Sequence, residues 1–89
     1  MYELIIKPEI GKILARLAKK ESAQVEIILR KVDEILQNPR RYKNLRAPLN
    51  SWKRVHIDSH FVLLFSVDEN AHTVTLEDYN HHDKIYKPR

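Results

Sequence analysis

The side chains with the clearest capacity for chemistry are histidines and one arginine in the second half of the chain. The sequence contains 5 histidines, and the four that concern us are His56, His60, His81 and His82. Imidazole has a pKa of about 6.5, so it can accept or donate a proton at neutral pH. Arg54 can hold a phosphate through two hydrogen bonds and stabilise charge on a phosphorane-like transition state. Together these groups would suffice to cleave RNA without a metal.

In such a reaction a base takes the proton of the 2′-OH, the oxygen attacks the adjacent phosphorus, and an acid protonates the departing 5′ oxygen. His56 and His60 are also consistent with surface histidines that have no role. His81 and His82 precede Asp83, which would suit a metal site. However, adjacent residues on a strand point to opposite faces, so the sequence favours no metal at this pair.

Positive charge is concentrated in one segment of the chain. The sequence has 16 basic and 12 acidic residues and a net charge of +4, yet residues 35–57 contain no acid. The bases of this segment are Arg40, Arg41, Lys43, Arg46, Lys53 and Arg54. Tyr42 and Trp52 lie among them, and cations combined with aromatic faces are typical of sites for single-stranded nucleic acid. An acidic protein partner or a solubilising loop would also explain these charges.

Composition excludes several other classes of protein. The 89 residues fit one domain, spanning 1–89, and 43% apolar content is enough for a modest core. The chain has no cysteine and a single glycine, which excludes disulfide scaffolds, thiolate chemistry and glycine-rich phosphate loops. No apolar run is long enough to span a bilayer, and no signal-peptide pattern opens the chain. We expect a cytoplasmic protein without a cofactor.

The first half of the chain predicts a strand followed by two helices. Residues 2–7 are typical of a strand, and Pro8 suits the first turn of a helix that ends near residue 20. Ser22 is a plausible N-cap for a second helix, which Asn38-Pro39 ends. Each helix has one apolar stripe with three- to four-residue spacing, and the turn between them is short. They should therefore form an antiparallel hairpin.

The second half changes to a period of two, which indicates three strands in an antiparallel meander. The predicted class is α+β with the order β-α-α-β-β-β and the helix hairpin on one face of a small sheet. If Val55 and Ile57 face the helices, Arg54 and His56 face away, and simple alternation places Tyr79 on that far face too. The open face is then expected to gather Arg54, His56, His60 and one of His81 or His82.

Two segments resemble the RelE/ParE superfamily of toxin–antitoxin systems, and RelE-type mRNA interferases in particular. Residues 45–65, which read WKR at 52–54 and HIDSHFVLLF at 56–65, are similar to the family's central hairpin. Residues 81–86, HHDKIY, are similar to its closing motif. The order of elements agrees over the whole chain. The resemblance implies the family's fold, with the first strand beside the last.

The resemblance also implies roles for residues. Arg54 matches a family arginine on the first strand of the hairpin, His56 a histidine or basic position, and His60 a polar position of the catalytic site. Many members have an arginine where this chain has Phe61. That difference leaves fewer cations for the phosphate and favours a chemistry based on histidine.

The closing motif supplies the remaining catalytic candidates. His82 and Tyr86 match the terminal basic residue and the aromatic that stacks on or orients the substrate, with His81 as the alternative to His82. In the working mechanism, His82 or His81 shares the base and acid roles with His56. Arg54 and His60 would stabilise the phosphorane. The expected RNA-binding residues are Arg40, Arg41, Lys43, Arg46, Trp52 and Lys53.

The function implied is that of a toxin that cleaves mRNA on the ribosome, without a metal, and is held inactive by a cognate acidic, RelB-like antitoxin. The expected partners are this antitoxin, the ribosome and mRNA, with no membrane and no small-molecule cofactor. Two alternatives remain. The first is an inhibitor of DNA gyrase like the ParE branch, against which the histidines argue. The second is a non-catalytic module that binds RNA or an acidic protein.

Overall fold

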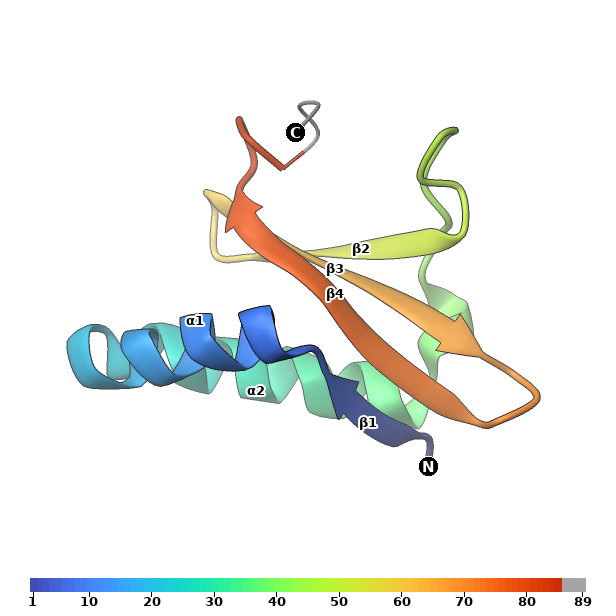
Figure 1. Ribbon diagram of the computed structural model, residues 1–89, viewed down its shortest axis with the longest axis horizontal. Helices are drawn as coiled ribbons and strands as arrows, with labels where there is room; N and C mark the ends of the chain where they lie inside the picture. Colours follow the sequence, from blue (N-terminus) through green and yellow to red (C-terminus); the bar gives the residue numbers. More distant parts are fainter. Residues whose placement is uncertain (86–89) are drawn as a thin grey trace.

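The computed structural model of the chain describes residues 1–85 and confirms the α+β architecture. Two helices lie on one side of a four-stranded sheet (Figure 1). The elements are β1 (Glu3–Ile6), α1 (Pro8–Lys20), α2 (Ser22–Gln37), the short 3-10 helix η1 (Pro39–Arg41), β2 (Trp52–Ile57), β3 (Phe61–Asp68) and β4 (Thr73–His81). The strand order is β1-β4-β3-β2. Because β1 runs parallel to β4, the sheet is mixed, and only β2, β3 and β4 form the expected antiparallel meander.

The helix hairpin has a connection of one residue. The backbone N–H of Glu21 donates to the carbonyl of Leu17 at 2.6 Å, and its own carbonyl accepts from the N–H of Gln24 at 3.0 Å. Glu21 therefore ends α1 and also precedes α2. The expectation that Ser22 caps α2 is wrong, because Ser22 already lies in the first turn. Within residues 1–85, neither helix has the length and apolarity needed to cross a membrane.

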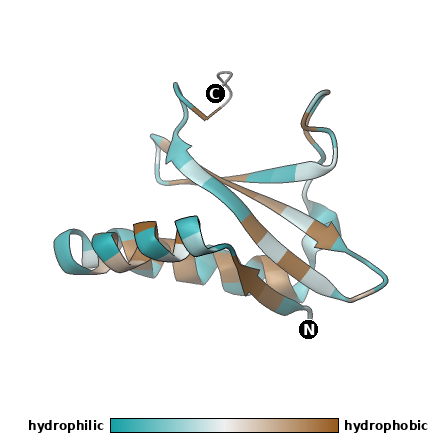
Figure 2. Cartoon of the chain, viewed as in Figure 1, coloured by the Kyte–Doolittle hydropathy of each residue, from teal (hydrophilic) through white to brown (hydrophobic). Residues whose placement is uncertain are grey.

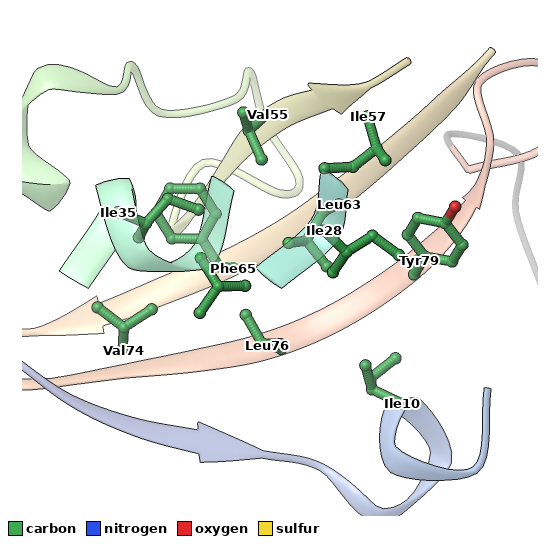
Figure 3. Packing of buried hydrophobic residues seen from close by; sticks show 11 residues of the cluster. Ile10, Ile28, Ile35, Val55, Ile57, Leu63, Phe65, Val74, Leu76 and Tyr79 are labelled. Carbon is green, nitrogen blue, oxygen red and sulfur yellow. The ribbon is translucent and has the colours of Figure 1, made fainter. Parts of the chain in front are cut away.

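The main core lies between the helix hairpin and the sheet (Figure 3). Ile10 comes from α1, whereas Ile28 and Ile35 come from α2, and all three are buried. From the sheet side, this core receives Val55, Ile57, Leu63, Phe65, Val74, Leu76 and Tyr79. Figure 2 shows hydrophilic residues at the free end of the hairpin, where the helices extend beyond the sheet. The packed part of each helix thus fixes the hairpin on one face.

The second face of the sheet is only partly open. Val62 and Leu64 of β3 are fully buried on this face, where they form a small second core with Ile85. Leu45 and Leu49 from the loop before β2 pack against the same cluster. Strand β3 is therefore buried on both faces. The loop and the C-terminal turn cover part of the face on which we expected the site.

A β-bulge changes the face of the sheet to which the side chains at the end of β4 point. The register pairs Leu64 with Asp78 but Phe65 with Leu76, so the pairing shifts by one residue between Leu64 and Phe65. As a result Tyr79 lies in the helix-side core with 5% of its surface exposed. The expectation that Tyr79 faces away from the helices is wrong, because an extra residue inverts the alternation beyond it.

The buried phenol of Tyr79 predicts a stability change in alkaline solution. Gln24 Nε2 donates to Tyr79 Oη at 2.7 Å, and burial raises the pKa of the phenol despite this bond. The raised folded-state pKa gives stability that is complete below the unfolded pKa of about 10 and is lost as pH rises through the folded pKa. In urea titrations, the free energy of unfolding should fall more steeply above about pH 10 in the wild type than in Tyr79→Phe. Parallel losses in the two proteins would contradict this.

Candidate functional site

A basic pocket lies between the loop before β2 and the exposed side of β2. Its volume is about 440 Å³. It is lined by Lys43, Asn44, Leu45, Arg46, Ala47, Pro48, Leu49 and Arg54. Among these described lining residues, three are cations, none is an acid, and the remainder are mainly apolar. Such a wall can bind a phosphate through its cations while its apolar part contacts a base or sugar.

The loop that forms the pocket is held by hydrogen bonds to β2. Lys53 Nζ donates to the carbonyl of Tyr42 at 2.6 Å and to Asn44 Oδ1 at 2.8 Å. The backbone N–H of Leu45 donates to the carbonyl of Trp52 at 2.9 Å. Leu45 and Leu49 then anchor the loop in the second core. Lys53 was expected to bind RNA, but its ammonium group instead holds the loop that forms the pocket.

Arg54 and His56 lie together on the exposed side of β2. Both are exposed, and they alternate with Val55 and Ile57, which are buried against the helices. The register aligns Arg54 with Leu64 and then Asp78, and aligns His56 with Val62 and then Asn80. Neighbouring strands are about 4.8 Å apart, so the Cα atoms of the β2 and β4 residues in each of these two rows are about 10 Å apart.

Asp78 and Asn80 are site neighbours that sequence reasoning missed. Simple alternation from Val74 and Leu76 would have placed Asp78 toward the helices. The bulge instead aligns Asp78 with Leu64, whose side chain belongs to the second core on the opposite face. Asp78 is therefore aligned with Arg54 across β3 on the same face of the sheet. To predict this from the sequence, one would have needed a sign of the β-bulge in β4.

Three histidines meet at the end of the sheet. His60 lies in the turn between β2 and β3, His81 is the last residue of β4, and His82 follows it. Ring centroids are 4.7 Å apart for His81 and His82, 5.9 Å for His60 and His81, and 6.5 Å for His60 and His82. The expectation that His81 and His82 diverge is wrong, because β4 ends at His81 and the next residue turns. The backbone N–H of His82 donates to the carbonyl of His60 at 2.8 Å and ties the two segments together.

The histidine cluster, defined as His60, His81 and His82, lies at the β2–β3 turn and the end of β4, outside the row formed by Arg54 and His56 on β2. His81 aligns with Phe61 and contacts its ring edge at a centroid distance of 5.6 Å. Phe61 packs against the helix-side core. The residues that we expected on one open face are thus in two places: Arg54 and His56 on β2, and the histidine cluster at the end of the sheet. Tyr86 lies outside the described residues.

The other expected RNA-binding residues have protein contacts of their own. Arg40 Nε lies 3.4 Å from Glu69 Oε2, and the guanidinium of Arg41 lies 5.8 Å from the ring centre of Tyr42. Trp52 packs against the second core. Their roles toward RNA stay predictions. Lys43 and Arg46 are the ones that the pocket brings together with Arg54.

A partly buried acid, Glu77, adds to the electrostatics of this face. The side chain of Glu77 is 9% exposed, pairs with Lys7 and accepts a hydrogen bond from Ser66 Oγ at 2.5 Å. The hydrogen bond with Glu77 raises the pKa of Lys7. Lys7 Nζ also lies 5.7 Å from the ring centre of Trp52. This pair neutralises a carboxylate that would otherwise oppose an anion on the face.

Comparison with known proteins connects this geometry to a family. No family model matches the sequence. An uncharacterized protein of Methanosarcina mazei is 64% identical over 86 residues, covering 97% of this chain and all of that protein. The protein of Methanocaldococcus jannaschii named "Putative toxin RelE4" is 55% identical over 89 residues, covering 100% of this chain and 95% of that protein. The chain belongs to the RelE/ParE toxin superfamily.

Solved structures of other toxins share the fold of this RelE-type chain. The YoeB/ParE toxin from Agrobacterium tumefaciens has a TM-score of 0.80 at 11% identity, covering 90% of this chain and 98% of that one. The toxin–antitoxin complex YoeB–YefM from Staphylococcus aureus gives a TM-score of 0.77 at 15% identity, with coverage of 92% and 98%. At these identities the agreement establishes the arrangement of helices and strands, as the RelE resemblance of the sequence predicted.

Proposed function

We propose that this RelE-type toxin is an endoribonuclease of a toxin–antitoxin system that cleaves mRNA on the ribosome. The observation that carries the proposal is the basic pocket, in which Lys43, Arg46 and Arg54 surround an apolar wall. His56 lies on the same exposed side of β2 as Arg54, two residues further along the strand. Three cations around one pocket suit a chain of phosphates, and an imidazole on the same side of β2 suits proton transfer. The reaction needs no metal, because the 2′-OH of the RNA is the nucleophile.

In this mechanism Arg54 binds the scissile phosphate and stabilises the phosphorane. His56 follows two residues later on the same face of β2, so the two Cα atoms are about 7 Å apart. Both side chains can therefore flank a single phosphodiester. A member of the histidine cluster, His82 or His81, shares the base and acid roles with His56.

The RNA strand would run from the basic pocket across the exposed side of the sheet to the histidine cluster. His60 assists Arg54 in stabilising charge, and Tyr86 orients the nucleotide. Lys43 and Arg46 supply further positive charge for the RNA backbone at the basic pocket. The substrate is thus single-stranded mRNA presented by the ribosome.

The proposed regulatory partner is an acidic antitoxin, RelB-like, encoded beside the toxin. The Staphylococcus aureus YoeB–YefM structure is itself a complex of a toxin with its antitoxin. In this chain, the acid-free segment 35–57 would attract an acidic, partly disordered segment. Such a segment would cover the basic pocket and exclude mRNA.

Primer-extension mapping of mRNA after induction in cells tests the function. We expect cuts in phase with codons in the wild type and their loss in Arg54→Ala and His82→Ala. Intact mRNA together with induction of the DNA-damage response would instead support a gyrase inhibitor of the ParE kind. Growth arrest with neither effect would contradict both toxin activities and favour a binding module.

A further inference from the structure

The histidine cluster has the arrangement of a metal-binding site. One ring nitrogen from each of His60, His81 and His82 can be chosen so that all three lie within 4.8 Å of one another. The ligands come from two segments that the His82–His60 backbone bond already joins. His60 and His82 are exposed and His81 is partly exposed, so an ion in solution can reach them.

The contacts of His82 place its second ring nitrogen beside Asp83. His82 Nδ1 lies 3.1 Å from the carbonyl oxygen of His60, which can only accept, so the proton belongs on Nδ1. Nε2 is then the nitrogen available to an ion, and it lies 3.0 Å from Asp83 Oδ1. A carboxylate thus stands next to the nitrogen through which His82 would bind a metal.

We propose that His60, His81 and His82, with Asp83 beside them, bind one divalent transition-metal ion of the Zn²⁺ class. Three imidazoles and a carboxylate are the donors that Zn²⁺, Co²⁺, Ni²⁺ and Cu²⁺ prefer, whereas Mg²⁺ and Ca²⁺ prefer oxygen ligands. Asp83 is placed either to complete the coordination or to orient a ring from outside it.

Binding requires a small rearrangement of side chains. In a tetrahedral site with Zn–N bonds of about 2.0–2.1 Å, ligand nitrogens are about 3.3 Å apart, compared with the separations of up to 4.8 Å here. Rotation of the exposed rings can close this gap without moving the backbone. His81 Nδ1 accepts the backbone N–H of Asp83 at 3.2 Å, and coordination through that atom would replace this bond.

A consequence for activity rests on the proposed function. An imidazole whose lone pair is bound to a metal cannot accept a proton, so the ion would inhibit cleavage by His81 or His82 and would be regulatory rather than catalytic. Metal binding is measured without RNA. Failure of the nuclease proposal would therefore leave the binding result unchanged, and failure of binding would leave the nuclease proposal untouched.

Calorimetric titration of the full, untagged chain with Zn²⁺ tests the site. His60→Gln/His82→Gln is compared with the matched control His56→Gln/His72→Gln, since each retains three of the five histidines. We expect one ion per chain in the wild type and in the control. The cluster variant should lose more than about 100-fold in affinity, beyond the loss from an outer-shell partner alone.

A second measurement does not depend on the folding of any variant. Addition of paramagnetic Co²⁺ to the wild type should give the ring resonances of His60, His81 and His82 the very large shifts of directly coordinated imidazoles, whereas His56 and His72 should show only small through-space shifts. Equal affinity of the two double variants, no binding by the wild type, or shifts at His56 or His72 as large as those of the cluster would overturn the proposal.

Discussion

Replacing Arg54 by alanine should reduce the rate of mRNA cleavage on ribosomes by about 10²–10³-fold, which is the typical cost of removing one preorganised donor from a developing negative charge. Arg54 is the residue that joins the basic pocket to the exposed side of β2. Its guanidinium can bind two phosphate oxygens at once, and a substitute without this group leaves the phosphorane without its main cation. The rate is measured by single-turnover cleavage with ribosome-bound mRNA in excess toxin.

Two further variants separate the role of Arg54 from general charge. Arg54→Lys keeps the charge but loses the bidentate geometry, so its rate should fall between those of the wild type and Arg54→Ala. Arg30→Ala removes an exposed cation from α2, on the helix side of the molecule, and should cleave at the wild-type rate. Equal losses in Arg30→Ala and Arg54→Ala would show that net charge alone matters and would contradict the assigned role.

The largest effect on stability is expected from Phe65→Ala. Phe65 has 0% of its surface exposed, contacts the ring of Tyr42 at a centroid distance of 5.5 Å, and belongs to the core beneath α2. Truncation of a buried phenylalanine lowers the free energy of unfolding by about 3–5 kcal/mol. The loss has two parts: the apolar contacts of the ring disappear, and the cavity left behind is only partly filled by the surrounding side chains. Urea unfolding followed by circular dichroism measures this loss.

Leu29→Ala is the matched control for Phe65→Ala. Leu29 lies on α2 with 53% of its surface exposed, so its truncation should change the free energy of unfolding by less than about 0.5 kcal/mol. A loss for Phe65→Ala as small as that of the control would mean that the helix-side core does not hold the sheet. The basic pocket would then need another source of rigidity.

The elements of the fold were predictable because their patterns are local. The apolar positions of α1 and α2 repeat at helical spacing, and Asn38-Pro39 ends α2 where expected. The turn after β3 also has a local signal in Asp68-Glu69-Asn70, since Asp68 Oδ1 accepts the N–H groups of Asn70 and Ala71 at 3.0 Å each. The parallel pairing of β1 with β4 joins distant segments. The RelE resemblance predicted that the first strand lies beside the last, but the parallel direction comes from the structure.

The site was harder to predict because its arrangement depends on pairing between strands. One bulge buries Tyr79, aligns Asp78 with Arg54 across Leu64, and places His81 toward Phe61. Alternation along a single strand contains no sign of this shift. The turn that brings His82 to His81 and the hydrogen bonds that occupy Lys53 are likewise properties of the folded chain. Residue types indicated the chemistry, whereas their grouping required the structure.

The most direct test of the central claim uses an mRNA with one 2′-deoxynucleotide at the position 5′ to a mapped cut. The proposed reaction needs that 2′-OH as its nucleophile. We predict cleavage of the all-ribose message to give a 5′-OH end, and no cleavage of the deoxy-substituted message at that position. Cleavage at the substituted position, or no cut in either message, would contradict the account.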